Sequence, residues 1–323
     1  MYGWLSRQVR RGYERLLRRE IGEGPTHVAI IQDGNRRYAR KQGENAPEGH
    51  REGADTSEQV LNWCEELGID ELTLYAFSTE NFERPPAERE PLFDIIEDKL
   101  YELADSDRVH DNAVCIRAIG EIDRLPARVR EAIEYAESNT AGYDGFRLNV
   151  ALAYGGRNEL LRAARDVAAA VDNGELDAAE IDPETIEQRL YRQPVRDVDL
   201  IIRTGGDERT SNFLPWHANG NEAAVYFCAP YWPEFSKIDF LRGIRTYEAR
   251  EESWQESKVD RAVALAGAVG SLELTEASEL VGRLRGTLPQ AGRRAVAEEL
   301  ETATPADDGA EPTGSEPPLD PAD

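Results

Sequence analysis

The sequence predicts an α/β protein in which one mainly parallel β-sheet is flanked by helices. The first observation is a rhythm, because short β-rich runs alternate with longer helical patterns along most of the chain. The second is that several short runs are almost continuously apolar, as strands buried on both faces are. The third is size, since 323 residues, 40% of them hydrophobic, suffice for the core of one large domain.

Six strands and four helices follow from these patterns. The predicted strands are His27–Ile31, Leu72–Phe77, Val114–Ile119, Leu148–Ala153, Asp199–Arg203 and Ala223–Cys228. The predicted helices are Ser57–Leu67, Pro91–Leu103, Ala127–Ser138 and Arg157–Val171, placed on both faces of the sheet. Because ligands of such folds bind at the carboxyl ends of the strands, a functional motif should directly follow a strand.

The two ends of the chain differ in composition from the domain between them, which we place at residues 25–300. Trp4 to Ile21 carries six arginines and two glutamates, with its apolar residues near one helical face. We therefore predict a basic amphipathic helix within residues 1–24. Two roles stay open for it: lying on an anionic membrane surface, or packing against the domain or a partner subunit. Residues 301–323, rich in Pro, Asp, Glu and Gly, are predicted to form a disordered acidic tail.

The charge balance narrows the classes of function. Acidic residues outnumber basic ones by 63 to 38, which gives a formal net charge of -25. A surface of this sign repels nucleic acid, so a general DNA- or RNA-binding role is excluded. Dense carboxylates with scarce lysine suit a cytosol very rich in salt. We predict a halophilic archaeal source, with an ordinary acidic cytosolic protein as the alternative.

Cysteine usage and hydropathy predict a cytoplasmic protein. Cys64, Cys115 and Cys228 lie far apart and form no C-x-x-C pair, which indicates buried thiols in a reducing compartment. The sequence has no long apolar run and no signal-peptide pattern. Peripheral contact with a membrane surface remains open because of residues 1–24.

The first chemistry-bearing motif is Asp33-Gly34-Asn35-Arg36-Arg37, which follows the first predicted strand. Gly34 allows a tight turn, and a helix beginning near Arg36 would direct free N–H groups at it. Amides, arginines and a helix N-terminus form an anion cradle. A carboxylate inside a phosphate cradle is explained by Mg²⁺, which bridges carboxylate and phosphate oxygens. The alternative is an ordinary surface turn.

Polar side chains also follow the second predicted strand. Ser78, Glu80, Asn81 and Arg84 surround Phe82 in the sequence. An aromatic ring beside polar groups suits a substrate with an apolar chain and a charged head. The alternative is a loop that caps the next helix. After the fourth strand, Tyr154-Gly155-Gly156-Arg157 is more typical of tight packing than of binding.

The fifth predicted strand delivers Arg203 to the same edge of the sheet. Gly205-Gly206 turns the chain, and Arg209 and Ser211 follow. Arginine, hydroxyl and glycine-rich backbone together are typical of a diphosphate site. Glu222, just before the sixth strand, is a second candidate metal ligand. Together the strand ends predict a cationic pocket for one or two diphosphates with Mg²⁺.

With these motifs the chain resembles the cis-prenyltransferase family of undecaprenyl and dehydrodolichyl diphosphate synthases. The resemblance spans roughly Thr26 to Tyr247 and rests on DGNRRYA, YAFSTENFERP, YGGR, IRTGGDERTSNF and YWPEF in the family's order. DGNRRYA is closer to the eukaryotic and archaeal branch than to the bacterial one. The resemblance implies a six-stranded parallel sheet, usually in a homodimer. It also implies repeated condensation of isopentenyl diphosphate onto an allylic diphosphate, with a Z double bond formed at each step.

The resemblance also implies roles for individual residues. Asp33 serves Mg²⁺ and the allylic diphosphate and is essential, and Glu222 is the second Mg²⁺ ligand. The allylic substrate is held by Gly34, Asn35, Arg36, Arg37, Tyr38, His50, Ser78, Thr79, Glu80, Phe82 and Arg84. Isopentenyl diphosphate is held by Arg203, Arg209, Thr210 and Ser211.

Asn81 is the proton acceptor by family analogy, but a carboxamide is a poor base, so we expect it to orient groups while released diphosphate takes the proton. Many bacterial relatives have a cation where this chain has Ala46, so one phosphate contact is missing here or comes from Arg40, Lys41 or Arg51.

Two alternatives to an active homomeric synthase stay open. One is a non-catalytic scaffolding subunit of a heteromeric synthase, although such subunits typically lose the residues matching Asp33 and Arg37. The other is an unrelated phosphate-binding α/β enzyme, but no P-loop or dinucleotide fingerprint is convincingly placed. Product length and primer are not fixed by the sequence. We expect a hydrophobic tunnel along the helices Ser57–Leu67 and Pro91–Leu103, and an archaeal source favours geranylgeranyl over farnesyl diphosphate as primer. The product would be a long polyprenyl diphosphate, precursor of a glycan carrier lipid.

Overall fold

The computed structural model describes residues 13–190, 195–218 and 223–251. The described residues up to Arg250 belong to one compact unit. The predicted tail at 301–323 and most of the predicted N-terminal helix lie outside the described residues, as does Glu222. The domain boundaries at residues 24 and 300 therefore stay predictions.

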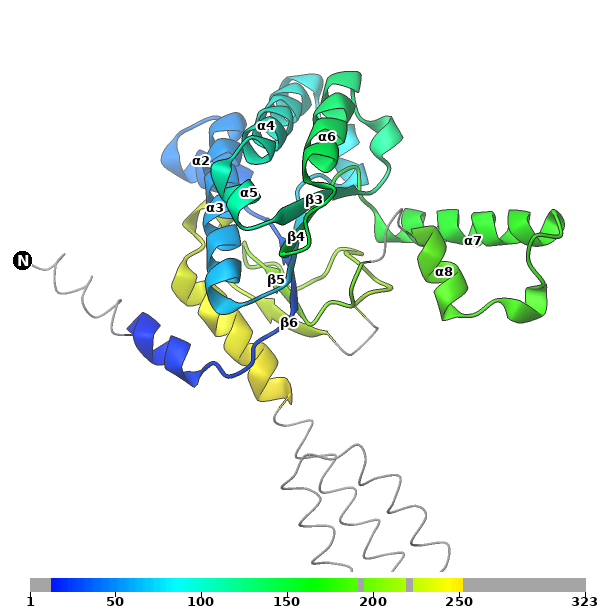
Figure 1. Cartoon of the computed structure of the whole chain (residues 1–323). Helices are drawn as coiled ribbons and strands as arrows, with labels where there is room; N and C mark the ends of the chain where they lie inside the picture. The colour runs from blue at the N-terminus through cyan, green and yellow to red at the C-terminus, as the bar shows by residue number, and fades with distance from the viewer. Residues whose placement is uncertain (1–12, 191–194, 219–222, 252–323) are drawn as a thin grey trace, which may run out of the picture. The chain divides into compact units, whose positions relative to one another are not determined.

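Six parallel strands form one sheet in the order β3-β4-β2-β1-β5-β6 (Figure 1). Their bounds are β1 His27–Ile31, β2 Glu71–Tyr75, β3 Val114–Ile119, β4 Phe146–Ala151, β5 Leu200–Arg203 and β6 Ala224–Phe227. All six predicted strands are confirmed, with ends that shift by at most two residues. Every residue of β1 is buried, as the continuous apolar run predicts for a strand at the centre of the sheet.

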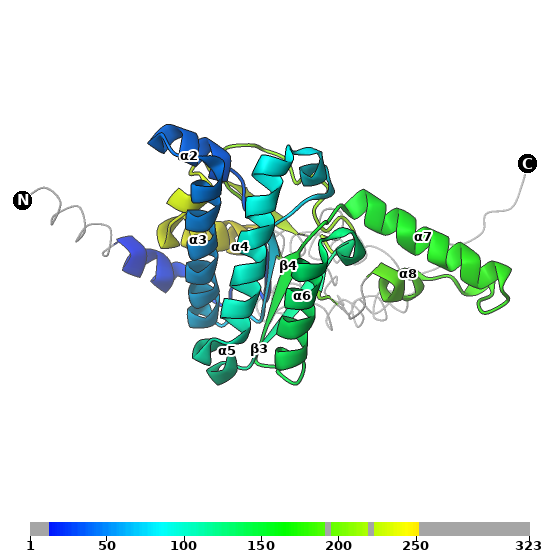
Figure 2. The same ribbon diagram turned by 90° about the horizontal axis from the view of Figure 1, so that it is seen from above.

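Helices α3, α4 and α6 pack side by side on one face of the sheet (Figures 1 and 2). The α-helices are α2 Asn35–Gln42, α3 Ala46–Leu67, α4 Pro86–Ala104, α5 Asp107–Asp111, α6 Ala127–Thr140, α7 Gly156–Asp172 and α8 Pro183–Leu190, with further helical stretches at 13–20 and 237–251. Short 3₁₀ helices lie at η1 Thr79–Glu83, η2 Ile122–Arg124, η3 Ala178–Glu180 and η4 Trp232–Glu234. The main core lies between this helix layer and the sheet.

Two predicted helix starts were wrong. The helix predicted from Ser57 begins at Ala46, because Asn45 caps its first turn and its early glycines fit against α2. The helix predicted from Pro91 begins at Pro86, and Pro91 lies inside it.

The second face of the sheet carries a smaller apolar cluster. Phe213 and Leu214, from the loop that follows β5, pack there on Ala29, Ile31 and Ile201. Among the described residues this cluster receives no side chain from a helix. The helix layer predicted for this face is therefore not seen in the part of the chain that the structure describes.

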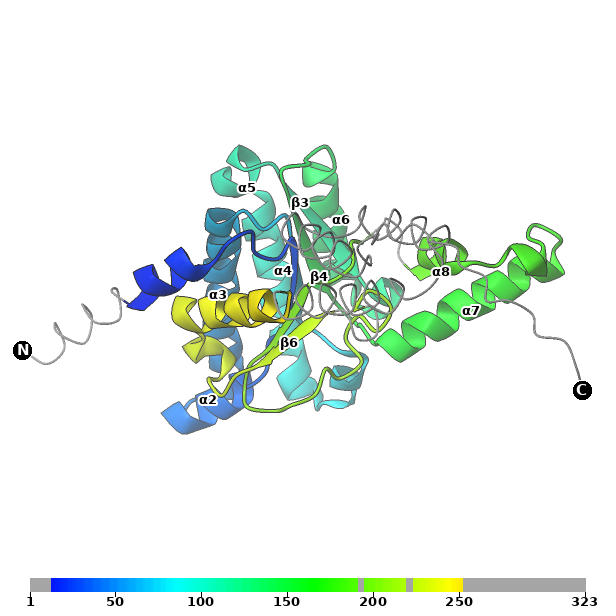
Figure 3. The same ribbon diagram turned by 90° about the horizontal axis from the view of Figure 1, so that it is seen from below.

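The stretch 13–20 packs against the helix at 237–251 (Figure 3). Leu17 is fully buried with Ile238 and Leu241. Lys237 pairs with Glu14 at 3.6 Å. Of the two roles left open for the N-terminal segment, packing on the domain is the one observed for its described residues.

The three cysteines are free and buried, as predicted. None of the described helices is both long and apolar enough to cross a bilayer.

Candidate functional site

The Asp33 turn lies between the carboxyl ends of β1 and β5. The chain leaves β1 at Ile31 and enters α2 through Gly34, whose φ is 108°. A Cβ atom on Gly34 would lie 2.7 Å from the Tyr231 side chain, so only glycine fits. The Thr204 hydroxyl donates to the Asp33 carbonyl at 2.7 Å and accepts from the Asp33 N–H at 3.0 Å. These bonds fasten the turn to the chain that follows β5.

The Asp33 carboxylate lies between two arginines. Its Oδ2 atom is 2.7 Å from Nη2 of Arg203, and its Oδ1 atom is 3.0 Å from Nη2 of Arg37. Burial alone would raise the pKa of Asp33, but hydrogen bonds and charges from both arginines outweigh it and hold that pKa below its ordinary value. Asp33 is therefore ionised at neutral pH. Gly205 has a φ of 84°, a left-handed conformation that favours glycine.

Arg203 organises the loop after β5. Its guanidinium is 4% exposed and donates to the Arg209 carbonyl and the Ser211 hydroxyl, both at 2.6 Å. Nη2 of Arg203 is also 3.2 Å from Asp207, whose same oxygen lies 3.1 Å from Arg209. Most donors of Arg203 are thus used within the protein, and a diphosphate would have to replace some of these partners.

The segment after β2 forms the short helix η1. The Ser78 N–H donates to Oδ1 of Asn81 at 3.1 Å, and the Ser78 side chain accepts from the Asn81 N–H. This capping box fixes the Asn81 carboxamide, which favours an orienting role over that of a base. Phe82 turns inward and packs against Phe77 and Phe93, with ring centroids 5.0 and 6.3 Å away.

His50, on α3, lies near two arginines of the site. Burial, followed by the charges of Arg84 and Arg36, lowers the pKa of His50 to about 4. Its imidazole is therefore neutral at pH 7, and an anion bound beside it would raise that pKa.

A cavity of about 560 Å³ opens where these segments meet. Most of the predicted site residues line it, namely Asp33, Asn35, Arg36, His50, Ser78, Glu80, Asn81, Arg84, Arg203, Arg209 and Ser211. An adjoining cavity of about 280 Å³ adds Gly34 and Arg37. Tyr38, Thr79, Phe82 and Thr210 line neither cavity, so their contact with a ligand stays a prediction.

Four carboxylates share this site with the arginines. Asp207 and Glu83 line the cavities beside Asp33 and Glu80. Asp207 and Glu83 are not among the site residues predicted from the sequence. No sequence pattern marks Asp207, because its contact with Arg203 depends on the geometry of the loop that follows β5. The predicted cationic pocket is therefore only weakly positive, because its arginines are largely neutralised by neighbouring carboxylates.

The described residues of the site do not form a site that holds a metal by protein groups alone. Among the described residues no three His, Cys, Asp or Glu side chains form a metal-binding group. Asp33, however, is ionised, 28% exposed and at the cavity wall. One carboxylate together with diphosphate oxygens suits Mg²⁺, which usually keeps several waters. The residues fit a metal shared with a diphosphate.

An apolar pocket adjoins the polar cavity. The two share Gln32, Asn35, His50 and Ala76. Beyond these residues the pocket is lined mainly by apolar side chains of α3, α4, β2 and β4. The two helices expected to line a hydrophobic tunnel do line this pocket. The arrangement suits a ligand with a charged head and an apolar chain.

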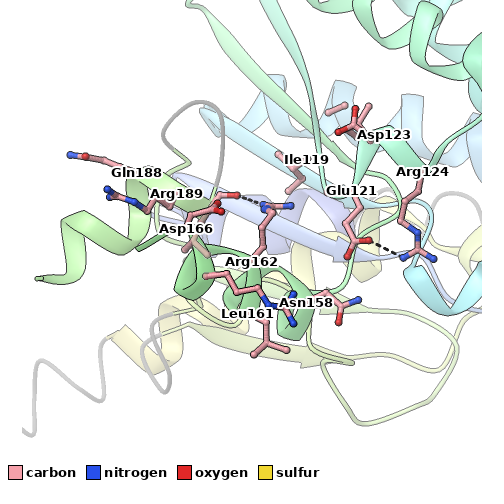
Figure 4. A pocket seen from close by; sticks show the side chains of 15 residues that line it. Ile119, Glu121, Asp123, Arg124, Asn158, Leu161, Arg162, Asp166, Gln188 and Arg189 are labelled. Carbon is pink, nitrogen blue, oxygen red and sulfur yellow. Dashed lines mark hydrogen bonds and ion pairs between the residues drawn. The ribbon is translucent and has the colours of Figure 1, made fainter. Parts of the chain in front are cut away.

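A cavity of about 910 Å³ lies elsewhere, between η2 and the pair of helices α7 and α8 (Figure 4). Arg124 pairs there with Glu121 at 2.9 Å, and Arg162 donates to the Leu190 carbonyl at 2.7 Å. It is larger than the strand-end cavity, but none of the predicted site residues that the structure describes line it. We therefore place the site at the strand ends.

Comparison with known proteins identifies the family of this chain. A family model described as "Putative undecaprenyl diphosphate synthase" matches residues 31–255. A tritrans,polycis-undecaprenyl-diphosphate synthase (geranylgeranyl-diphosphate specific) of Haloarcula marismortui is 62% identical over 302 residues, covering 93% of this chain and 99% of that protein. The protein of the same name from Halobacterium salinarum is 66% identical over 277 residues, covering 86% and 91%.

Solved structures show the same fold. Lavandulyl diphosphate synthase from Lavandula x intermedia, in complex with dimethylallyl diphosphate, aligns with a TM-score of 0.65 at 35% identity, covering 70% of this chain and 95% of that one. A probable undecaprenyl diphosphate synthase from Campylobacter jejuni aligns with a TM-score of 0.56 at 33% identity, covering 69% and 95%. With the strand-end site and these matches together, the chain belongs to the cis-prenyltransferase family, in its archaeal branch.

Proposed function

We propose that this protein repeatedly joins isopentenyl diphosphate to an allylic diphosphate, with Z geometry, to give a long polyprenyl diphosphate for a glycan carrier lipid. The observation that carries the proposal is the ionised Asp33 between Arg37 and Arg203, in a polar cavity that continues into an apolar pocket. The printed specificity of the haloarchaeal relatives supports geranylgeranyl diphosphate as the primer.

The arginines supply the electrostatics of the reaction. The allylic carbon–oxygen bond breaks as the new carbon–carbon bond forms, and negative charge grows on the departing diphosphate. Arg36, Arg84 and Arg209 line the cavity that would hold this charge. Fixed cations in a partly dry site stabilise such charge more than water does. A proton is then lost from the isopentenyl unit to the released diphosphate, with Asn81 orienting the groups.

Mg²⁺ is the proposed cofactor, held by Asp33, by Glu222 and by diphosphate oxygens. When bound, it would neutralise diphosphate charge and favour departure of the leaving group. The ionised state of Asp33 supports this assignment.

A homodimer is the proposed assembly. Leu161 on α7 is 55% exposed and lies beside the cavity between η2, α7 and α8, which carries charges of both signs (Figure 4). Homodimers usually form through a self-complementary, two-fold interface, and the exposed Leu161 gives a position at which to test this surface. Light scattering should show a dimer that Leu161→Asp dissociates. A monomeric parent protein would contradict the assembly.

We propose a cytoplasmic location, and the abundance of carboxylates together with the haloarchaeal relatives supports a halophilic source. Peripheral membrane contact would then rest on residues before Tyr13, which the structure does not describe.

The decisive experiment incubates the pure protein with labelled isopentenyl diphosphate, Mg²⁺ and either geranylgeranyl or farnesyl diphosphate, in high salt and detergent. We expect long products, with geranylgeranyl diphosphate the better primer. A scaffolding subunit would elongate neither primer alone and would act only when a second chain is added. Absence of elongation under every condition would overturn the proposal.

A further inference from the structure

The apolar pocket is too small for the product, an argument that rests on the proposed function. Its volume is about 110 Å³. A protein cavity of about 150 Å³ holds one benzene molecule. The pocket as it stands therefore accommodates about one five-carbon unit, and a growing prenyl chain stays shielded from water only if a wall of the pocket moves.

The walls differ in how easily they can move. Strands β2 and β4 line one side and are paired with strands on both of their edges, so a shift there would break the sheet. Helices α3 and α4 line the other side and, among the described residues, make no backbone–backbone hydrogen bond to another element. Packed helices can slide or separate without loss of their own backbone hydrogen bonds. The seam between α3 and α4 is the wall that can open.

Lys99 ties this seam together. From α4 its Nζ atom lies 2.6 Å from Glu58 and 3.6 Å from Asp55, both on α3, and 2.8 Å from Glu102 on its own helix. Across α3 and α4, which the structure describes in full, the ion pairs that join the two helices are both made by Lys99.

Lys99 and Glu58 also belong to the lining of the pocket. Their side chains are 26% and 37% exposed, so the pair lies where the pocket wall meets solvent. A partly exposed ion pair is weak, whereas burial of each added isoprenoid unit is strongly favourable. The pair can close an empty pocket and still give way to a growing chain.

We propose that the apolar pocket opens at the seam between α3 and α4, that the Lys99–Glu58 pair holds this seam closed, and that Lys99 thereby limits the length of the product. Lys99 is a specificity-determining residue that takes no part in the bond-forming step.

The test compares the product lengths of Lys99→Met with those of the parent protein at equal first-condensation activity. Methionine keeps the length of the side chain and removes the charge. The population with an open seam should rise about 1.5- to 5-fold, the range that a weak ion pair represents. The main product should then lengthen by at least one five-carbon unit. Glu58→Gln should shift it in the same direction, and Lys99→Arg should keep the parent length.

Arg128→Met is the matched control. Arg128, on α6, pairs with Glu97 and Asp94 of α4 at 2.6 and 2.8 Å, so it also ties α4 to a neighbouring helix, but it does not line the pocket. Parent product length is expected for this variant. An unchanged length in Lys99→Met, or an equal shift in both variants, would overturn the proposal.

The dependence of product length on salt gives a second test, because a residue with a merely structural role would not change that dependence. Since salt screens the pair, the parent product should lengthen as KCl rises toward 1 M, where the screening length is about 3 Å. Lys99→Met should give long products at every salt concentration. If the parent protein fails to condense even one unit, the proposed function fails; if it condenses but the salt series does not separate the two proteins, only the seam is refuted.

Discussion

Asp33 shares the balancing of the Arg203 charge with a second carboxylate. Arg203 is almost fully buried, and its guanidinium is balanced by Asp33 and Asp207. A buried cation that loses one of two carboxylate partners keeps partial compensation, which limits the structural damage of a substitution at Asp33. Function and stability can therefore be separated at this position.

Asp33→Asn should lower the condensation rate at least ~10²-fold, because the site loses its ionised ligand at the point where diphosphate charge develops. The midpoint of thermal unfolding should change little, because Asp207 still faces Arg203. Steady-state kinetics and thermal unfolding measure the two effects. Asp70→Asn is the control, since Asp70 pairs with Arg196 at 2.6 Å away from the lining of the site and should leave the rate unchanged. An Asp33→Asn protein with parent activity would refute the role of Asp33.

The lowered pKa of His50 predicts that the stability of the fold decreases as the pH falls. Its folded-state pKa of about 4 lies below that of an exposed histidine, so the unfolded chain takes up the proton first as the pH falls. The contribution of His50 to stability is present above about pH 6.5 and is lost progressively down to about pH 4.

Chemical denaturation between pH 7 and 4 measures this effect as the difference between the parent protein and His50→Gln, which should lack the loss. His110→Gln is the control because His110 is exposed on α5. A difference that does not depend on pH would show that the imidazole is not held neutral by the fold.

At the scale of elements, the sequence predicts the strands that are buried in the core. It does not predict a helix start that depends on contact with a neighbouring element. The strands were predicted closely because a buried parallel strand is an apolar run. The start of α3 was missed because Gly49 and Gly53 are poor helix formers. A Cβ atom at either glycine would lie 2.3 Å from an oxygen of Asn35 on α2, so these positions serve a close helix contact.

The candidate site shows the same difference between features that follow from the sheet and features that depend on tertiary contacts. Its edge of the sheet follows from parallel topology, so Asp33, Ser78 and Arg203 were brought together as predicted. The internal partners of Arg203 were not predicted, because Asp207 reaches it only through the fold of a loop in which Ser211 has a φ of 51°. Such loop geometry depends on tertiary contacts rather than on a sequence pattern.

The turn between β1 and α2 yields a prediction about a single methyl group. Gly34→Ala combines a positive φ with a 2.7 Å contact to Tyr231, whereas Gly43→Ala, at the end of α2, has a φ of 79° and nothing within 4 Å of the added carbon. Gly43→Ala should cost about 1 kcal/mol of unfolding free energy from backbone strain alone. Gly34→Ala should cost about 1–3 kcal/mol more and should lower activity, because the turn shifts. Urea denaturation measures both. Equal costs would mean that the Tyr231 contact relaxes freely.

At the scale of the whole molecule, the negative electrostatic potential around the protein repels its proposed anionic substrates. The chain carries a formal net charge of -25, and its proposed substrates are anions. The cavity offers five arginines against four carboxylates, namely Arg36, Arg37, Arg84, Arg203 and Arg209 against Asp33, Glu80, Glu83 and Asp207. The cavity arginines therefore attract a diphosphate only at short range, whereas the net negative charge of the protein repels it at long range. Salt screens the long-range part first, since the screening length falls from about 30 Å at 0.01 M to about 8 Å at 0.15 M.

The affinity for inorganic diphosphate should consequently rise with KCl from about 0.01 M to a few tenths molar, opposite to the trend of a basic anion-binding protein. Titration calorimetry within the salt range where circular dichroism shows an unchanged fold measures the trend. Arg209→Gln separates the two contributions: it removes one cavity cation, so it should weaken binding by a similar factor at every salt concentration and keep the rise. An affinity that falls steadily with salt in both proteins would mean that the cavity arginines dominate at all distances, and that the acidity of the surface has no influence on substrate capture.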